Sequence, residues 1–174
     1  MTLEKGYIHI YTGNGKGKTT AAIGLGMRAV GDNLKVYMIQ FMKGRRYSEI
    51  DALEHVHNFT VVQFGRDEFV SKKNPEQIDI DFAKQAFMHA KTIIEGGAYD
   101  VVILDEINVA VDYQLISLEQ IMQLLHIKPS HVEVVLTGRY AHPEMVKHAD
   151  VVSEILEIKH MYQQGVQSRK GIDW

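Results

Sequence analysis

Short apolar runs alternate with longer amphipathic segments along the whole chain. The short runs have the length of strands, whereas the amphipathic segments repeat their apolar residues at helical spacing. Predicted strands cover 6–12, 34–41, 59–64, 100–106, 131–139 and 151–160. Predicted helices cover 19–30, 46–57, a long segment from Asn74–Pro75 to Gly96–Gly97, segments around 107–126, and 142–149. This alternation predicts an α/β fold with a parallel sheet and helices on both faces.

The run DVVILDE, at 100–106, is apolar without interruption between its flanking acids. A continuous apolar strand is typical of a position buried on both faces of a parallel sheet. No linker rich in Pro, Gly or Ser divides the chain, and no internal repeat occurs, so we predict a single domain over 1–174. Because ligands of such sheets bind at the carboxyl ends of strands, the informative residues follow the first, fourth and fifth strands.

Two predicted helices carry further local signals. In the long helix, Asn74 is the expected N-cap and Pro75 the first helical residue. Its expected buried face consists of Ile78, Phe82, Ala86, Ala90, Ile93 and Ile94. Gly24 and Gly26 lie inside the first helix, where each costs about 1 kcal/mol relative to alanine. Close packing of that helix on the sheet explains both glycines.

The stretch YTGNGKGKTT, between the first strand and the first helix, nearly matches the phosphate-binding pattern G-x-x-x-x-G-K-[ST]. Thr12 stands where the first glycine belongs, and a glycine follows one residue late. Alternate glycines let backbone amides point inward at a helix N-terminus, where they bind anions. Lys18 supplies a charge to the phosphates, and the Thr19 hydroxyl suits a bridging Mg²⁺. The predicted nucleotide-binding residues are Gly13, Asn14, Gly15, Lys16, Gly17, Lys18, Thr19 and Thr20.

An acid pair, Asp105–Glu106, ends the fourth strand. A carboxylate at this position can hold Mg²⁺ directly or through water, and a second one can orient a nucleophile. A solvated pair that caps the next helix is the structural alternative. Together with the preceding loop, the pair predicts a metal site made of Thr19, Asp105 and Glu106.

Two further segments end at the same predicted edge of the sheet. Thr137-Gly138-Arg139 closes the fifth strand, and Arg139 could meet phosphate as a bidentate fork. Phe41-Met42-Lys43-Gly44 closes the second strand and could line a substrate pocket or form an ordinary turn. The nine histidines include no H-E-x-x-H, so we assign most of them to the surface or to packing.

Composition narrows the function classes. The 174 residues carry a net charge of −3, from 19 basic and 22 acidic residues, which argues against a general nucleic-acid-binding surface. The absence of cysteine excludes disulfides, thiolate metal sites and cysteine nucleophiles. The N-terminal MTLEKGYIHIY has no long apolar run, so we predict no membrane span and a cytoplasmic location.

These residues predict ATP and Mg²⁺ but leave three reactions open. A kinase would transfer the γ-phosphoryl group and usually has an arginine-rich lid, which we do not find in the sequence. An ATPase would use Glu106 to orient water. A third reaction attacks the ribose 5′ carbon and expels the whole triphosphate, for which the loop must stabilise a leaving group.

The motifs TGNGKGKTT, QFMKG, VVILDEIN, LTGR and KHxYxxGxxxxxGIDW, in this order from about Tyr7 to Trp174, resemble the ATP:corrinoid adenosyltransferases of the cobalamin pathway, the BtuR/CobO/CobA type. The resemblance implies a three-layer, P-loop NTPase-like (RecA-like) fold with a mainly parallel sheet of about six strands. It also implies that a corrinoid cobalt(I) attacks C5′ of ATP and releases triphosphate. The late glycine is itself a mark of this family, whose ATP lies reversed, with the γ-phosphate where other P-loop proteins hold the β-phosphate.

The resemblance assigns roles residue by residue. Lys18, Glu106 and Arg139 become the catalytic residues, and Mg²⁺ or Mn²⁺ the metal. ATP is the co-substrate and the corrinoid the substrate. Partners implied are a reducing flavoprotein and a second copy of the chain in a homodimer. The corrinoid pocket would include Phe41, Met42, Lys43 and Phe69.

Overall fold

A computed structural model describes residues 2–173 of the chain. Over this range it has one six-stranded, all-parallel sheet with the order β3-β2-β4-β5-β1-β6. The strands are β1 (Ile8–Thr12), β2 (Val36–Phe41), β3 (Phe59–Phe64), β4 (Val101–Asp105), β5 (Glu133–Thr137) and β6 (Val151–Glu154). The predicted α/β class and the predicted parallel sheet are confirmed.

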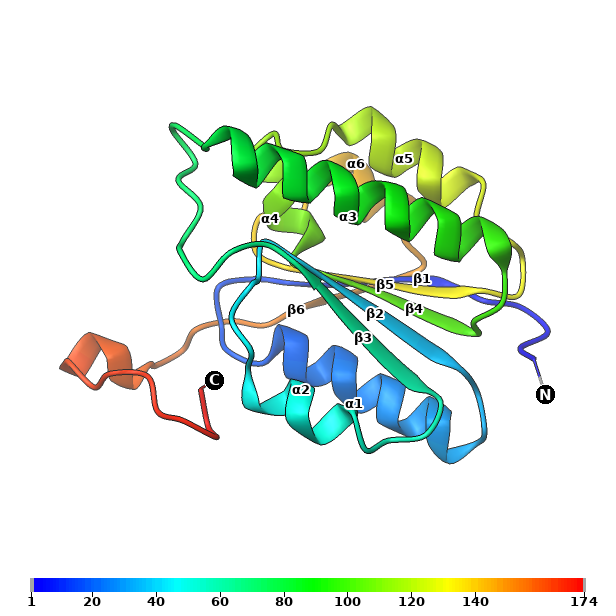
Figure 1. The fold of residues 1–174 in the computed structure, drawn as a ribbon, viewed down its shortest axis with the longest axis horizontal. Helices are drawn as coiled ribbons and strands as arrows, with labels where there is room; N and C mark the ends of the chain where they lie inside the picture. The colour runs from blue at the N-terminus through cyan, green and yellow to red at the C-terminus, as the bar shows by residue number, and fades with distance from the viewer. Residues whose placement is uncertain (1, 174) are drawn as a thin grey trace.

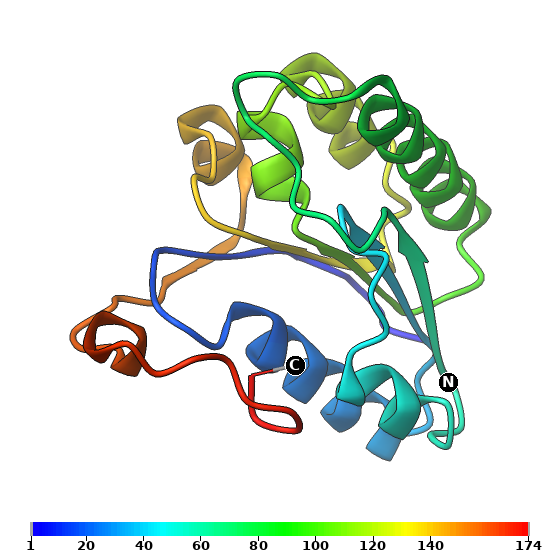
Figure 2. The ribbon, with the colours of Figure 1, turned by 60° about the vertical axis from the view of Figure 1, so that its left-hand side comes forward.

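Helices cover both faces of the sheet, so the fold has three layers (Figures 1 and 2). On one face lie α1 (Lys18–Gly31) and α2 (Ser48–Leu53). On the other lie α3 (Gln77–Gly96), α4 (Ile107–Asp112), α5 (Leu118–His126) and α6 (Pro143–His148). After β6 the chain runs as an irregular tail with a short 3₁₀ helix, η1 (Met161–Gln164). Among the described residues, no helix combines the length and the hydropathy that a bilayer span requires.

The central strands are buried on both faces because each face has its own apolar core. Ile39 pairs with Leu104, and both side chains belong to the core beneath α3. Their neighbours Met38 and Ile103 also pair, and these belong to the core beneath α1. Successive residues of a strand point to opposite faces, so an uninterrupted apolar run fills both cores at once. The prediction that 100–106 is buried on both faces is confirmed by β4.

The predicted strand 151–160 is wrong in its second half, because β6 ends at Glu154. Its only partner among the described strands is β1, which itself ends at Thr12, opposite Glu154. One more backbone bond forms, from Ile155 N to Thr12 O, and the ladder then has no further partner. At Ile155 and Leu156 the chain instead runs alongside the phosphate loop.

The predicted start of the long helix is also wrong. Helix α3 begins at Gln77 with Glu76 as N-cap, and Asn74 and Pro75 precede it. Glu76 and Asp79 form a reciprocal capping box, and Asp79 is held further by an ion pair with Arg66. This tertiary contact outweighs the local Asn-Pro signal. The buried face shifts accordingly: Ile78 is 46% exposed, and Ala83 and Phe87 are buried with Ala86, Ala90 and Ile94.

The two glycines of α1 have different surroundings. A Cβ on Gly26 would lie 2.5 Å from Cε2 of the buried Phe59, so close packing on the sheet explains this glycine. Gly24 is exposed, and a Cβ there would have no neighbour within 4 Å among the described atoms. The packing explanation is therefore wrong for Gly24.

This difference predicts opposite effects of the same substitution two residues apart. Gly24→Ala should raise the free energy of unfolding by about 1 kcal/mol, because alanine favours the helix and meets no obstacle. Gly26→Ala should lower it by about 1–2 kcal/mol net, because the methyl group overpacks against Phe59. Urea unfolding of both variants measures the pair. Equal shifts of the same sign would contradict the packing described.

Candidate functional site

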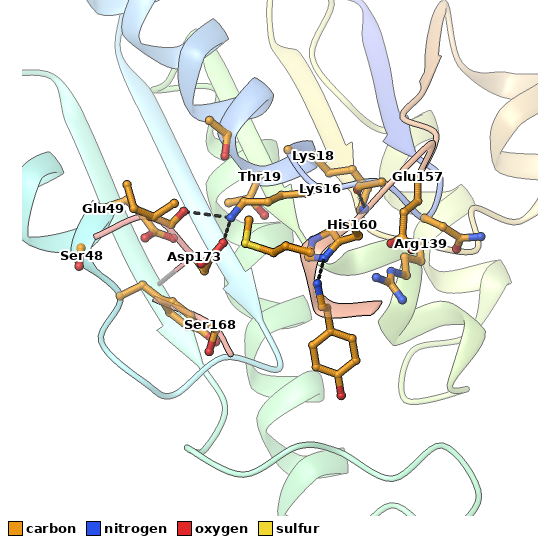
Figure 3. Close-up of a pocket in the computed structure, with 18 of the residues that line it drawn as sticks. Lys16, Lys18, Thr19, Ser48, Glu49, Arg139, Glu157, His160, Ser168 and Asp173 are labelled. Carbon is orange, nitrogen blue, oxygen red and sulfur yellow. Dashed lines mark hydrogen bonds and ion pairs between the residues drawn. The ribbon is translucent and has the colours of Figure 1, made fainter. Parts of the chain in front are cut away.

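A cavity of about 830 Å³ opens at the carboxyl edge of the sheet. The phosphate loop, α2, the ends of β4 and β5, and the C-terminal tail all contribute side chains to it (Figure 3). The strand order places β5 between β1 and β4, so the loop after β1 and the acids after β4 face each other across the end of β5. This is the edge at which the sequence predicts the ligand.

The phosphate loop ends at Gly17, whose φ of 120° is a conformation that suits glycine. Lys18 begins α1, and its nearly buried side chain donates from Nζ to the Gly15 carbonyl at 2.6 Å. Burial lowers the pKa of Lys18, and the neighbouring Glu106 carboxylate opposes that shift. The cavity is lined by every predicted loop residue except Gly13, namely Asn14, Gly15, Lys16, Gly17, Lys18, Thr19 and Thr20.

The first two glycines of the loop contact the tail. The Gly15 amide donates to the Ile155 carbonyl at 2.7 Å. A Cβ would lie 2.4 Å from Ile155 O if added to Gly13, and 2.6 Å from Leu156 O if added to Gly15. These glycines therefore let the tail backbone approach the loop. The sequence did not predict this contact, and the predicted binding of phosphate by Gly13 and Gly15 stays a prediction.

Asp105 is fully buried and joins the segments that form the site. Its Oδ1 accepts from the hydroxyls of Thr19 (2.8 Å) and Thr137 (2.6 Å). Its Oδ2 accepts from Gln40 Nε2 (3.0 Å) and Lys43 Nζ (2.7 Å). Both oxygens are thus engaged by the first helix and by the ends of β2 and β5. In this arrangement Asp105 holds Thr19 in place, and a metal would reach it through that hydroxyl or through water.

The charges in this cluster stabilise one another. Burial opposes ionisation of Asp105, but the ion pair with Lys43 and the hydrogen bonds from Lys43, Thr137 and Thr19 hold the pKa of Asp105 below its usual value. Burial likewise opposes the charge of Lys43, yet Asp105 and Glu106 together raise the pKa of Lys43. A buried carboxylate with this many donors stays ionised and fixes its neighbours.

Glu106 follows in a left-handed conformation, with φ 63°, at the N-cap of α4. Its amide donates to Thr137 Oγ1 at 3.0 Å, and its side chain lines the cavity. Burial, and then repulsion from Asp105, raise the pKa of Glu106. Within residues 2–173 no group of three or more His, Cys, Asp or Glu side chains is placed to hold a metal. The hard oxygens of Thr19 and Glu106 instead fit Mg²⁺, which takes most ligands from phosphate and water.

Arg139 reaches the cavity from the turn after β5. The turn depends on Gly138, whose φ is 125° and where a Cβ would lie 3.1 Å from Asn108 Cβ. Asn108, fully buried, donates from Nδ2 to the Gly138 carbonyl at 3.0 Å. Sequence reasoning missed Asn108, although an amide within the apolar run INVAV after the acid pair was a signal.

Comparison with known proteins decides the family. The family model described as ATP:corrinoid adenosyltransferase BtuR/CobO/CobP matches residues 4–174. The chain belongs to this family. A corrinoid adenosyltransferase of Escherichia coli K12 is 38% identical over 173 residues, which cover 98% of this chain and 87% of that protein.

Two other relatives agree. The corrinoid adenosyltransferase CobA of Salmonella typhimurium is 37% identical over the same shares of both chains. A corrinoid adenosyltransferase of Pseudomonas aeruginosa is 32% identical, over 98% of this chain and 85% of that protein. The predicted family membership is confirmed, and the nucleotide kinase and the general ATPase are not favoured.

Of the four residues expected to contact a corrinoid, the structure places three at the cavity or beside it and one in the core. Lys43 and Phe69 line the cavity, and Met42 lies beside them in a small adjoining hollow. Phe41 is fully buried in the core beneath α3, so its assignment to the corrinoid pocket is wrong. The alternation of β2 explains this, since Phe41 shares the face of Ile39.

The tail adds residues to the site that sequence reasoning left without a role. Lys16 of the phosphate loop forms an ion pair with Asp173 and donates to the Ile172 carbonyl at 3.1 Å (Figure 3). His160, Ser168 and Asp173 line the same cavity as the loop. Gly171, Ile172 and Asp173 of the ending GIDW therefore line the same cavity as the phosphate loop, and Trp174 lies outside the described residues.

Thr137 offers a test of the Asp105 cluster. Thr137→Val should lower the free energy of unfolding by about 1–3 kcal/mol, because it leaves the Glu106 amide without its acceptor and removes one of the two hydroxyl donors to Asp105 Oδ1. Thr137→Ser keeps the hydroxyl and is the matched control. Denaturant unfolding of the two variants checks this; a valine variant as stable as the serine variant would contradict the bridging role.

Proposed function

We propose that this protein transfers the 5′-deoxyadenosyl group of ATP to the cobalt(I) of a corrinoid and releases triphosphate. The observation that carries the proposal is one cavity in which a phosphate-binding loop faces Lys43, Phe69 and the tail. One side of the cavity therefore suits a polyphosphate, and the other offers an aromatic side chain and backbone to a large flat ligand. Family membership supplies the identity of that ligand.

In this proposal the chain's own residues bind and orient the triphosphate. Lys18 and the loop amides stabilise the negative charge that grows on the leaving group. Arg139, which lines the same cavity, would contact the nucleotide. Thr19 and Glu106, with Asp105 behind them, would hold Mg²⁺ (or Mn²⁺), which would neutralise phosphate charge when bound.

The step balances without an acid or a base. The cobalt(I) electron pair forms the bond to C5′, the C5′–O bond breaks, and its electrons leave on the triphosphate. Cobalt(I) thereby becomes formally cobalt(III), and its two electrons are the bonding pair of the new cobalt–carbon bond. The protein contributes positioning and charge stabilisation, and bound substrates would displace water from the cavity.

The setting of the reaction extends the proposal. We expect a reducing flavoprotein to supply the electron that makes cobalt(I), a homodimer as the working form, and the cytoplasm as the location, with residues 1–174 folding as a single domain. All four follow from the resemblance or from composition.

The products distinguish this reaction from its rivals. With ATP, Mg²⁺ and chemically reduced cobalamin, phosphorus NMR should show triphosphate as the phosphorus product. Hydrolysis with Glu106 orienting water would give ADP and phosphate without any need for cobalamin. ADP and phosphate as the main products would contradict the proposal.

Lys18 should be indispensable to turnover. We expect Lys18→Ala to lower the rate of adenosylation by about 100-fold or more, because the leaving triphosphate loses its buried counter-charge. Lys84→Ala, which removes an exposed lysine from α3, is the matched control and should behave as the wild type. The spectral change of reduced cobalamin on forming the cobalt–carbon bond measures both. Wild-type turnover in Lys18→Ala would refute the assigned role.

A further inference from the structure

Phe69 lies at the middle of the connection from β3 to α3, which runs from the carboxyl edge of the sheet to the helix layer on the far face (Figures 1 and 2). Its side chain is 100% exposed, yet it lines the cavity and the adjoining hollow. A phenyl ring in full contact with water gains nothing for the fold. Residues 66–72, which carry it, are called here the Phe69 arch. Since packing of Phe69 does not hold the arch, other contacts must do so.

Arg66 fixes the first end of the arch. Its guanidinium pairs with Asp79 (Nε to Oδ1, 2.8 Å), with Glu76 (Nη2 to Oε1, 2.7 Å) and with Glu68 (Nη1 to Oε2, 2.7 Å). Asp79 is buried, and it and Glu76 are the capping-box residues of α3. The arch therefore begins on the N-terminus of a 20-residue helix, which is a rigid support. Because the planar guanidinium of Arg66 binds several carboxylates at once, it fixes the direction of the arch as well as its distance from α3.

Lys72 fixes the second end. Its Nζ lies 2.6 Å from Asp112 Oδ2, at the end of α4. The same ammonium lies over the rings of Tyr113 and Tyr140, 5.7 Å and 5.6 Å from their centroids. Tyr140 directly follows Arg139, so this end of the arch is tied to the wall of the nucleotide site. Arg66 and Lys72 are called here the two clamps of the arch, and Phe69 lies three residues from each.

We infer that Arg66 and Lys72 are positioning residues for the corrinoid: together they hold the arch so that Phe69 faces the tetrapyrrole from a fixed place. The inference rests on the proposed function, because it takes the corrinoid as the ligand that Phe69 meets. A purely structural role for Lys72 predicts almost no effect of its removal, since an exposed ion pair contributes little stability. A positioning role predicts a specific loss of corrinoid binding.

The variants Arg66→Gln, Lys72→Gln and Phe69→Ala test this, with Lys91→Gln as control, which breaks an exposed Lys91–Glu95 pair on α3. With chemically reduced cobalamin as substrate, the KM for cobalamin should rise about tenfold in both clamp variants, with the KM for ATP unchanged. Adding Phe69→Ala to Lys72→Gln should cause less than the sum of the separate losses, because both act through one ring. Lys91→Gln should match the wild type.

A second measurement needs no turnover. Amide hydrogen exchange of peptides covering 67–72 in the substrate-free protein should be faster in Arg66→Gln and Lys72→Gln than in the wild type or Lys91→Gln. Arg66→Gln leaves the buried Asp79 without its cation and could unfold the protein. Arg66→Lys keeps a positive charge beside Asp79 and serves as the second variant at this position. Unchanged exchange, additive losses, or equal shifts in both KM values would overturn the inference. If the wild type makes no triphosphate, the proposed function is wrong. The hydrogen-exchange measurement would still show whether Arg66 and Lys72 hold the arch in place.

Discussion

The buried carboxylate of Asp105 is the constraint on which the site depends. An ionised group without solvent must be satisfied by donors, and those donors come from α1, from the end of β2 and from the end of β5. The hydrogen bonds to this one side chain therefore fix α1 and the ends of β2 and β5 relative to one another. The hydroxyl of Thr137 also sets the backbone that places Glu106 in its left-handed turn.

The cavity built on this cluster has two unlike sides. Around Lys18 and Thr19 it offers amides, cations and hydroxyl oxygen, which suit a triphosphate. Around Phe69 and the tail it offers an aromatic ring and irregular backbone. An enzyme that expels an intact triphosphate needs this division, because the nucleophile must reach carbon on the side away from the phosphate-binding amides. Gly13 and Gly15 let the tail lie against the loop and so help to close the cavity.

Local patterns predicted the strands, the phosphate loop and the acid pair, because each signal lies within a few neighbouring residues. The roles that were missed act across the sheet: Gln40 and Thr137 lie in the motifs QFMKG and LTGR, but no local spacing shows that both bind Asp105 from other strands. The start of α3 was misplaced because a distant arginine, Arg66, selects the cap. Phe41 was assigned to the pocket from its neighbours in sequence, although strand alternation turns it into the core.

The orientation of the bound nucleotide tests the central claim most directly. A crystal structure with Mg²⁺ and an unreactive ATP analogue would show which end of the triphosphate lies deepest in the loop. The account predicts the γ-phosphoryl group beside Lys18 and the ribose C5′ turned toward the side of the cavity that Phe69 lines. A γ-phosphoryl group directed at Phe69, with C5′ enclosed by the phosphate loop, would contradict it.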